Sequence, residues 1–326
     1  MIKIKKIFQI NNYFLFIITL MIGCVCVNPT LSINACFDGI LVWAQKLLPA
    51  LLPFFFLTRL FTELGGVKII GKVMTPITKF LYNTDGNSGY VYAMSVLSGY
   101  PVGAKLVVDL YERGEITRGQ AYRTTTFTST SGPLFVIGTV GVGMFFDQRL
   151  GLLVMLCHSI GALLNGLIYR NYRKKDLFIL PKTASVNSGN ILENSMLSSI
   201  KSILVVGGYV CFFFVVIAML NEYNILHPLN LIISKTTPLS YTTSGSILNG
   251  IVEITRGCLD ASFCNLSFKS ALVYLSTIIS FGGISINLQA LTFLKRIGFS
   301  SKFYFLSKFT QTLITFALSL LFCLFV

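Results

Sequence analysis

About nine apolar segments, joined by short polar connectors, constrain this chain more than any other feature. A transmembrane helix needs about 20 consecutive apolar residues, so segments of this length predict an all-α polytopic membrane protein. The composition agrees, because only 12% of the 326 residues are charged and the mean hydropathy is +0.74, whereas about a quarter of a soluble globular chain is charged. The segments lie at roughly 13–33, 48–65, 89–110, 124–146, 150–169, 201–220, 243–262, 270–293 and 303–326.

The distribution of positive charge predicts which face of the membrane each connector occupies. The chain carries 26 Lys and Arg against 12 Asp and Glu, a net charge of +14, and cytoplasmic connectors are enriched in Lys and Arg. If the N-terminus is cytoplasmic and 89–110 returns to the side it entered from, every dense basic cluster becomes cytoplasmic. Because the positive charge follows the connectors, we expect no nucleic-acid partner. The clusters are Lys3/Lys5/Lys6, Lys68/Lys72/Lys79, Arg113/Arg118/Arg123, Arg170/Arg173/Lys174/Lys175/Lys182 and Lys295/Arg296/Lys302.

The stretch SGYPVGAK, residues 98–105, explains how the segment 89–110 can return to the side of the membrane from which it entered. Gly99, Pro101 and Gly103 interrupt helical backbone, and irregular backbone is tolerated in a membrane only where protein or a watery cavity surrounds it. We therefore expect a re-entrant helical hairpin with its tip at this stretch. As a plain crossing, the segment would place the basic cluster that follows it outside the cell.

A second copy of this plan follows later in the chain. Residues 48–146 contain a spanning helix, a connector, the hairpin and a span broken at TSTSGP, and residues 201–293 repeat that order with LNGIVEITRGCL as the hairpin and a span broken at SFGG. Two crossings between the copies place them in opposite orientations, which predicts two inverted repeats, each with a re-entrant helical hairpin and a broken transmembrane helix. The expected boundaries are 1–35 for an N-terminal membrane anchor helix, 36–169 for the first repeat, 170–200 for a cytoplasmic basic connector and 201–326 for the second repeat.

Three ionisable residues lie at or beside the two expected hairpin tips. Lys105 follows the first tip, and Glu253 and Arg256 lie at the matching place in the second. Charged groups at membrane depth usually face a bundle interior or pair with one another. One hypothesis is that Lys105 and Glu253 approach across the pseudo-two-fold axis and bind a polar or anionic solute. The alternative is a structural ion pair, or a lysine whose ammonium reaches the membrane interface.

Small and hydroxyl-bearing residues at the two breaks supply a second kind of chemistry. Their donors and acceptors can replace the hydration of a solute, and half-helix ends carry partial charge. The alternative is that Ser and Thr bond to their own helix and that Gly permits close packing. The matched clusters favour a midplane site for a small polar solute, with Na⁺ or H⁺ as the candidate coupling ion and no other cofactor. The expected site residues are Ser98, Gly99, Pro101, Gly103, Lys105, Ser129, Ser131, Gly132, Glu253, Thr255, Arg256, Ser280, Gly282, Gly283, Ser285 and Asn287.

Motifs of well-known enzyme classes are missing from the sequence. It contains no phosphate loop ending in GKS or GKT, no HExxH and no GxSxG, so it predicts a protein that is not an enzyme and has no ATPase motor of its own. The two histidines, His158 and His227, are far apart and lack a carboxylate cluster, which gives a metal site little support. Arg59 and Glu63 share one helix face and predict a structural ion pair.

Five motifs resemble those of the YlbJ-type sporulation integral membrane proteins of spore-forming Gram-positive bacteria, within the nucleoside-recognition or Gate domain group. The resemblance covers nearly the whole chain from about residue 36, and it implies a plan similar to that of concentrative nucleoside transporters and a role in forming the spore cortex or envelope. The motifs are GILVWAQKLLPALLPFFFLTRLF (39–61), SGYPVGAKL (98–106), TSTSGPLFVIGTVGVGMF (128–145), GIVEITRGCL (250–259) and SFGGISINLQ (280–289).

The repeat and the resemblance together lead to two hypotheses. The first is a secondary transporter or permease of a small polar solute, with a midplane site between two inverted hairpin repeats. The second is a non-transporting membrane assembly or morphogenetic factor in spore envelope formation. Both place a multi-pass protein in the cell membrane, in the mother-cell or forespore membrane during sporulation. The expected partners are the solute, membrane lipid, and either further copies of the chain or other sporulation membrane proteins.

Overall fold

The computed structural model describes residues 2–179 and 190–326, and every regular element within these ranges is helical. Lys182 and the middle of the expected connector 170–200 lie outside the described residues. The elements are α1 (Ile2–Val27), α2 (Pro29–Val42), η1 (Trp43–Leu47), α3 (Leu48–Glu63), α4 (Gly66–Tyr82), α5 (Gly86–Ser98), α6 (Val102–Glu112), α7 (Arg118–Thr128), η2 (Leu134–Val142), α8 (Gln148–Ile168), α9 (Ile191–Glu222), α10 (His227–Thr236), α11 (Tyr241–Val252), α12 (Ile254–Ser262), α13 (Phe268–Phe281), α14 (Gly283–Leu294), η3 (Lys295–Ile297) and α15 (Ser301–Phe322).

Several helices are long and apolar enough to cross a membrane. Among the described residues, four pass this test by length and composition: α8, α9, the stretch Phe268–Ile297 and α15. A bent pair, Leu15–Val27 with Pro29–Gln45, makes a fifth if it is counted as one span. The expectation of an all-α, multi-pass membrane protein is confirmed at this level.

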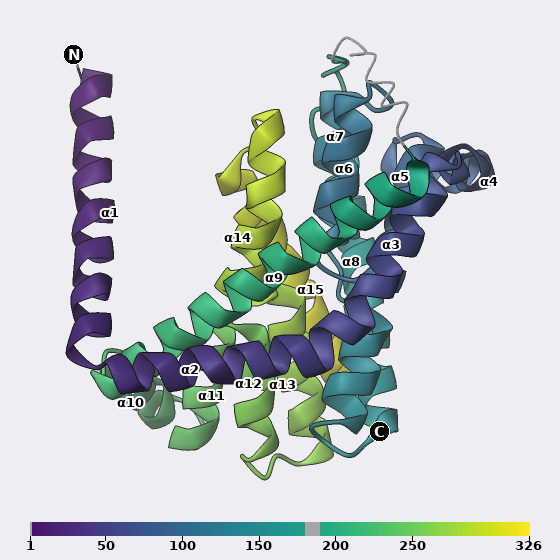
Figure 1. Ribbon diagram of the computed structural model, residues 1–326. Coiled ribbons are helices and arrows are strands. Elements are labelled where there is room, and N and C mark those ends of the chain that lie inside the picture. The colour runs from purple at the N-terminus through teal and green to yellow at the C-terminus, as the bar shows by residue number, and fades with distance from the viewer. Residues whose placement is uncertain (1, 180–189) are drawn as a thin grey trace.

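The first apolar segment differs from the expected crossing at 13–33. Helix α1 ends at Val27, and the two parts of the bent pair meet at 102°. Pro29 cannot continue the helical hydrogen bonds of α1, and the side chain of Asn28 accepts a bond from the Leu31 amide, which starts α2 in a new direction. In Figure 1 α1 stands apart from the other helices, whereas α2 runs across the molecule beside α9.

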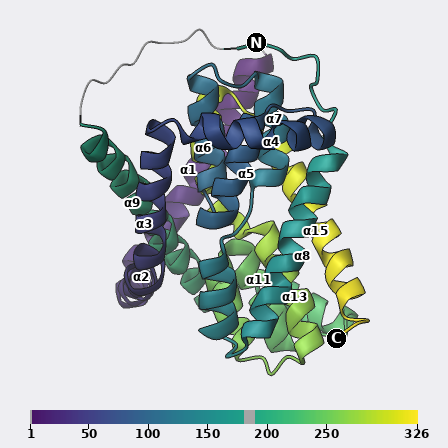
Figure 2. The same ribbon diagram turned by 90° about the vertical axis from the view of Figure 1, so that its right-hand side faces the viewer.

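Three of the spanning elements form a compact bundle. Helices α8, α13 and α15 contact one another and run side by side in Figure 2. Buried apolar residues of α8 and α13, together with η2 and α12, form one hydrophobic cluster between these helices. Helix α9 instead lies obliquely along α2 and α3 (Figure 1), and it packs against α14 on the same side of the bundle.

Two pairs of short helices fold back on themselves. Helices α5 and α6 meet at Gly99–Pro101, and the Asn87 side chain near the start of α5 donates to the Glu115 carbonyl just beyond α6, at 3.2 Å. Helices α11 and α12 meet at Glu253, and the backbones of Gly250 and Gly257 touch on either side of this turn. Both turns fall where the sequence predicts hairpin tips.

Two further helix pairs are interrupted where the sequence predicts broken spans. Residues 129–133 separate α7 from η2, and Gly282, with φ of 82°, separates α13 from α14. A left-handed backbone of this kind favours glycine, because it has no Cβ to clash with the carbonyl. The chain therefore contains two breaks, one after each folded-back pair.

Four of the basic clusters, as far as their residues are described, gather at one end of the molecule, here called the basic end. Burial raises the pKa of the Asp176 carboxyl, but the hydrogen bond and charge of Arg118, the Phe178 amide and the charge of Arg173 together outweigh burial and keep this pKa below its usual value. Helix α4 lies across this end in Figure 2. The contacts that join separate clusters here are Arg113–Glu63 at 2.8 Å, Arg296–Glu112 at 2.8 Å, Arg118–Asp176 at 2.8 Å and the Arg170 side chain to the Phe80 carbonyl at 2.8 Å.

The opposite, far end is marked by contacts of the first turn of α13 with the start of α8 and with the residue after α15. The Arg149 guanidinium lies 5.6 Å from the centre of the Phe268 ring, and the Lys269 ammonium donates to the Cys323 carbonyl at 2.9 Å. Consequently, α7 and η2 run from the basic end to the far end, whereas α13 and α14 run from the far end to the basic end. The two interrupted pairs therefore have opposite directions.

The contact between Gly250 and Gly257 gives a stability prediction. A methyl group on Gly257 would overlap the Gly250 backbone, so Gly257→Ala should lower the free energy of unfolding by about 1–3 kcal/mol. Gly208→Ala in α9 is the control, because a Cβ there meets no atom within 4 Å. Heating the detergent-solubilised protein and measuring the monodisperse fraction compares the two. Equal melting temperatures for both variants would contradict the close packing of α11 on α12.

Candidate functional site

The two turns and the first break meet around one cavity of about 60 Å³, to which α14 contributes Ile286 and Gln289. An ordered water needs about 10–15 Å³ of such space, so the cavity has room for more than one water-sized group. Leu97–Tyr100 line it from the first turn, Glu253–Thr255 from the second, and Ser131–Gly132 from the first break. Residues of α3 and α9 complete an apolar wall. The cavity is thus bounded by both halves of the chain.

The first turn packs directly on the first break. Gly99, with φ of 76°, lies so close to the Gly132 amide that a Cβ on either glycine would press on the backbone of the other. The hydroxyl of Tyr100, also in the turn, donates to the Ser129 carbonyl at 2.8 Å. Small side chains are required at the two glycines because backbone meets backbone there.

The second turn packs on the second break in a corresponding way. Gly283, at the start of α14, lies against the backbone of Gly250 and Ile254, leaving no room for a side chain. The Glu253 carboxylate accepts a 2.8 Å bond from the Arg256 amide and so caps the N-terminus of α12. This carboxylate is buried, with 1% of the residue exposed, and its residue also lines the cavity.

His158 of α8 connects the two breaks. Its Nε2 accepts a hydrogen bond from the Ser131 amide at 2.9 Å, and its Nδ1 lies 2.7 Å from the Ser280 hydroxyl. Because an amide N–H can only donate, Nε2 carries no proton and Nδ1 donates to Ser280. The imidazole is completely buried, and this arrangement fixes it as the neutral tautomer.

Lys308 of α15 reaches the first break from another side. Its ammonium donates to the Tyr100 hydroxyl at 2.7 Å, to the Gln311 side-chain oxygen at 2.9 Å and to the Ser129 carbonyl at 3.3 Å. Only 1% of Lys308 is exposed. The turn, the break and the last helix are therefore joined through one buried cation.

Most of the residues expected at the site lie at the cavity or at the turns and breaks that surround it. Ser98, Gly99, Ser131, Gly132, Glu253 and Thr255 line the cavity. The others occupy the turn, the breaks or buried positions of α6 and α14: Pro101, Gly103, Ser129, Ser280, Gly282, Gly283, Ser285 and Asn287. Asn287 donates from its amide to the Phe281 carbonyl at 3.0 Å, which satisfies the end of α13.

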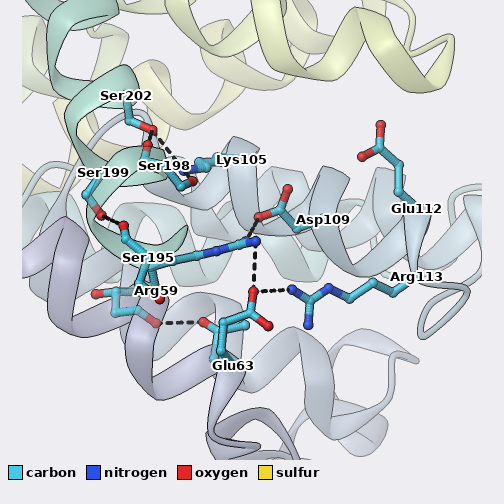
Figure 3. Close-up of polar contacts among 12 residues, drawn as sticks. Arg59, Glu63, Lys105, Asp109, Glu112, Arg113, Ser195, Ser198, Ser199 and Ser202 are labelled. Carbon is cyan, nitrogen blue, oxygen red and sulfur yellow. Dashed lines mark hydrogen bonds and ion pairs between the residues drawn. The ribbon is translucent and has the colours of Figure 1, made fainter. Parts of the chain in front are cut away.

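The structure does not bring Lys105 and Glu253 together. The Lys105 ammonium donates to the hydroxyls of Ser198 and Ser202 on α9, at 3.0 and 2.8 Å (Figure 3). Lys105 stands in the first turn of α6 on the face toward α9, whereas Glu253 caps its own helix. The hypothesis of a pair across the two halves is therefore wrong.

Arg256 also lies away from the cavity. Its guanidinium pairs with Asp260 at 2.9 Å, one turn further along α12. Because the backbone amide of Arg256 serves Glu253 while its side chain follows the outside of the helix, the residue supports the turn without lining the cavity.

The predicted pair of Arg59 and Glu63 is present and forms part of a larger network. Arg59 lies 2.8 Å from Glu63 and 2.7 Å from Asp109, and Glu63 also contacts Arg113 at 2.8 Å. Figure 3 shows these side chains between α3 and α6, beside the serines of α9. The network ties the first folded-back pair to α3 near the basic end.

Tyr100, His158 and Lys308 were not among the residues expected from the sequence. Tyr100 lies within the SGYPVGAK motif, and Lys308 is the basic residue of the apolar run 303–326, so each carried a local signal. The role of His158 had no local signal, because its partners are 27 and 122 residues away. In the described part of the chain, no three His, Cys, Asp or Glu side chains come together as a metal site would need.

Comparison with known proteins agrees with this architecture. Residues 44–146, which include the first folded-back pair and the first break, match the Gate family, described as nucleoside recognition. This part of the chain is therefore similar to a Gate domain. It is 29% identical over 336 residues to the sporulation integral membrane protein YlbJ of Bacillus subtilis (strain 168), an alignment that covers 93% of this chain and 79% of the relative. The resemblance indicated by the five motifs is confirmed, and neither description names an enzyme. No solved structure matches the chain.

The bridge at His158 gives a second prediction. In His158→Leu the Ser131 amide and the Ser280 hydroxyl both lose their partner, and a buried polar group left unpaired costs about 1–3 kcal/mol. Ser280→Ala is the matched variant, because it removes one bond and leaves the Ser131 amide paired. His158→Leu should therefore unfold at a lower temperature than Ser280→Ala in detergent. Equal melting temperatures would show that His158 does not hold the first break.

Proposed function

We propose that this chain is a permease for a small polar solute and that it acts in spore formation. The observation that carries the proposal is the meeting of both turns and the first break at one cavity, whose mainly apolar lining includes several polar side chains. Backbone interrupted at membrane depth is typical of transporters, where it surrounds the substrate. The similarity to a sporulation integral membrane protein supports the setting.

Two inverted repeats give this permease its plan. In the proposal, α5 and α6 form a re-entrant hairpin that enters from the basic end, because residues at its two ends contact each other there. Helices α11 and α12 form the second hairpin, connected to the far end through the residues before α13. Inverted repeats of this kind place the substrate near the midplane and allow access from either side in turn.

The orientation follows from the positive charge. Lys and Arg are enriched on the cytoplasmic side of membrane proteins, so the basic end is proposed to be cytoplasmic. The start of α1 lies at the same end in Figure 1, which supports a cytoplasmic start. The protein then spans the cell membrane several times, in the mother-cell or forespore membrane during sporulation.

The lining of the cavity indicates which solute it accepts. Ser98, Ser131 and Thr255 offer hydroxyl groups and Gln289 offers an amide, whereas Leu47 and Val206 belong to the apolar wall. A solute with one hydrogen-bonding edge and one apolar face fits both sides of such a site. Glu253 adds a carboxylate that can accept a bond from a solute N–H or O–H.

Cysteine labelling tests the proposed topology. In a cysteine-free background, single cysteines at Arg118, Lys175 and Lys295 should react with a membrane-impermeant thiol reagent from the cytoplasm, and a cysteine at Asn265 should react from outside. Labelling of the cysteine at Arg118 from outside would make α5 and α6 a plain crossing, and the inverted repeat would be lost.

Labelling inside the cavity tests transport itself. Single cysteines at Ser98 and Thr255, one at each turn, should react with small impermeant reagents, because an alternating-access permease opens the cavity to water. The native Cys157, restored alone in the same background, is the control, because it is completely buried in α8 and should stay unreactive. Equally unreactive cysteines at both turns would favour the non-transporting assembly factor.

A further inference from the structure

Lys308 of α15 is buried, and its surroundings are unusual for an ammonium group. The group has three protons, and the structure places three acceptor oxygens around it at 2.7, 2.9 and 3.3 Å. The ammonium also lies 4.9 Å from the centre of the Tyr100 ring. Every proton of the ammonium therefore has a partner.

The three acceptors are all uncharged. They are a phenol hydroxyl, a side-chain amide oxygen and the Ser129 backbone carbonyl. Among the described residues, Lys308 is not part of any ion pair. A buried charge without a carboxylate needs compensation from dipoles, and neutral oxygen atoms in this arrangement are also the ligands that a free hard cation would take.

The position in the fold is as informative as the ligands. Ser129 follows the last residue of α7, so its carbonyl stands at the C-terminal end of a half-helix, where the helix dipole is negative. Carbonyls at such interrupted helix ends hold the coupling cation in transporters with broken helices. The Ser129 carbonyl here accepts additional bonds from Tyr100 at 2.8 Å and from the Gln311 amide at 3.3 Å.

The second break differs in this respect. There the carbonyl of Phe281, the last residue of α13, accepts a hydrogen bond from the neutral amide of Asn287 at 3.0 Å. The first break thus has the Lys308 ammonium beside two uncharged donors, Tyr100 and Gln311, whereas an uncharged amide bonds the carbonyl at the second. A general need to fill a gap in the backbone would not require a charge at one break only.

We propose that the Lys308 ammonium is a tethered cation that occupies the place at the first break where a free monovalent cation would otherwise bind. The cation site at the first break is then filled without Na⁺, because the ammonium is a permanent part of α15. If so, Na⁺ is not the coupling ion of the proposed permease at this place. The inference rests on the proposed function only where it calls the ion a coupling ion. The occupancy itself can be measured as stability, without any transport assay.

The test compares melting temperatures of the full-length protein in detergent at constant ionic strength, with choline chloride replaced by NaCl, LiCl, KCl or NH₄Cl. The wild-type protein should show the same melting temperature in all five salts. Lys308→Ala should melt several degrees lower in choline and regain stability in NH₄Cl or NaCl, with a shift that rises with concentration, because the vacated oxygens bind the free ion. Lys308→Met should show no rescue, because its side chain fills the space. Lys302→Ala, at an exposed position of the same helix, is the control and should behave as the wild type.

Two outcomes would overturn the proposal: a wild-type protein stabilised by Na⁺ relative to choline, or a folded Lys308→Ala protein that no small cation stabilises. If Lys308→Ala does not fold, Gln311→Glu is compared with Gln311→Leu, because both variants lose the bond to the Ser129 carbonyl and only the first adds a carboxylate. Beside a true ammonium, Gln311→Glu should melt at a higher temperature than Gln311→Leu, whereas a lower melting temperature for Gln311→Glu would show that no cation is present at this place. Since these readouts do not depend on flux, a failure here is distinguishable from a failure of the permease proposal, which the labelling at Ser98 and Thr255 tests.

Discussion

Backbone groups at the two breaks must be satisfied inside the protein, because the interior of a bilayer offers them no water. This requirement determines where polar side chains appear in an otherwise apolar chain. The Ser131 amide is bonded to His158, the Ser129 carbonyl to Tyr100 and the Phe281 carbonyl to Asn287. The partners at the first break come from other elements, so the backbone there can stay interrupted only while those elements remain packed around it.

The same requirement explains how much of the fold the sequence could predict. Glycine, proline and serine within apolar runs mark positions where helices stop, and the predicted turns at 98–105 and 250–259 and the breaks at TSTSGP and SFGG lie where the structure has them. The bend after α1 was missed, although Asn28–Pro29 is a local signal for it. The apolar composition of 13–33 predicted one crossing, but composition does not determine the direction in which the chain continues as a new helix at a proline.

The candidate site was predictable to a different degree for different residues. Small residues at turns were identified because close backbone contact leaves no alternative to them, as at Gly99 and Gly132. The prediction that Lys105 approaches Glu253 was wrong because the direction of a side chain depends on its helix face. The distance of Lys105 from the hairpin tip along the sequence did not determine that face. Lys308 and Tyr100 are 208 residues apart, and contacts over such distances leave no periodic pattern in a single sequence.

The two turns are held by unequal interactions, and this inequality bears on how the cavity could open. The first is tied by directional hydrogen bonds through Tyr100, and the Tyr100 ring also lies against Gly282, so this turn touches both breaks. The second is held by close glycine contacts, by the capping bond that Glu253 makes within its own helix pair, and by a 3.0 Å hydrogen bond from Tyr274 of α13 to the Gly257 carbonyl. Separating hydrogen-bonded groups in a water-free interior leaves them unpaired. Movement of the first pair away from its break would therefore leave the Ser129 carbonyl without Tyr100, and movement of α11 and α12 away from α13 would leave the Gly257 carbonyl without Tyr274.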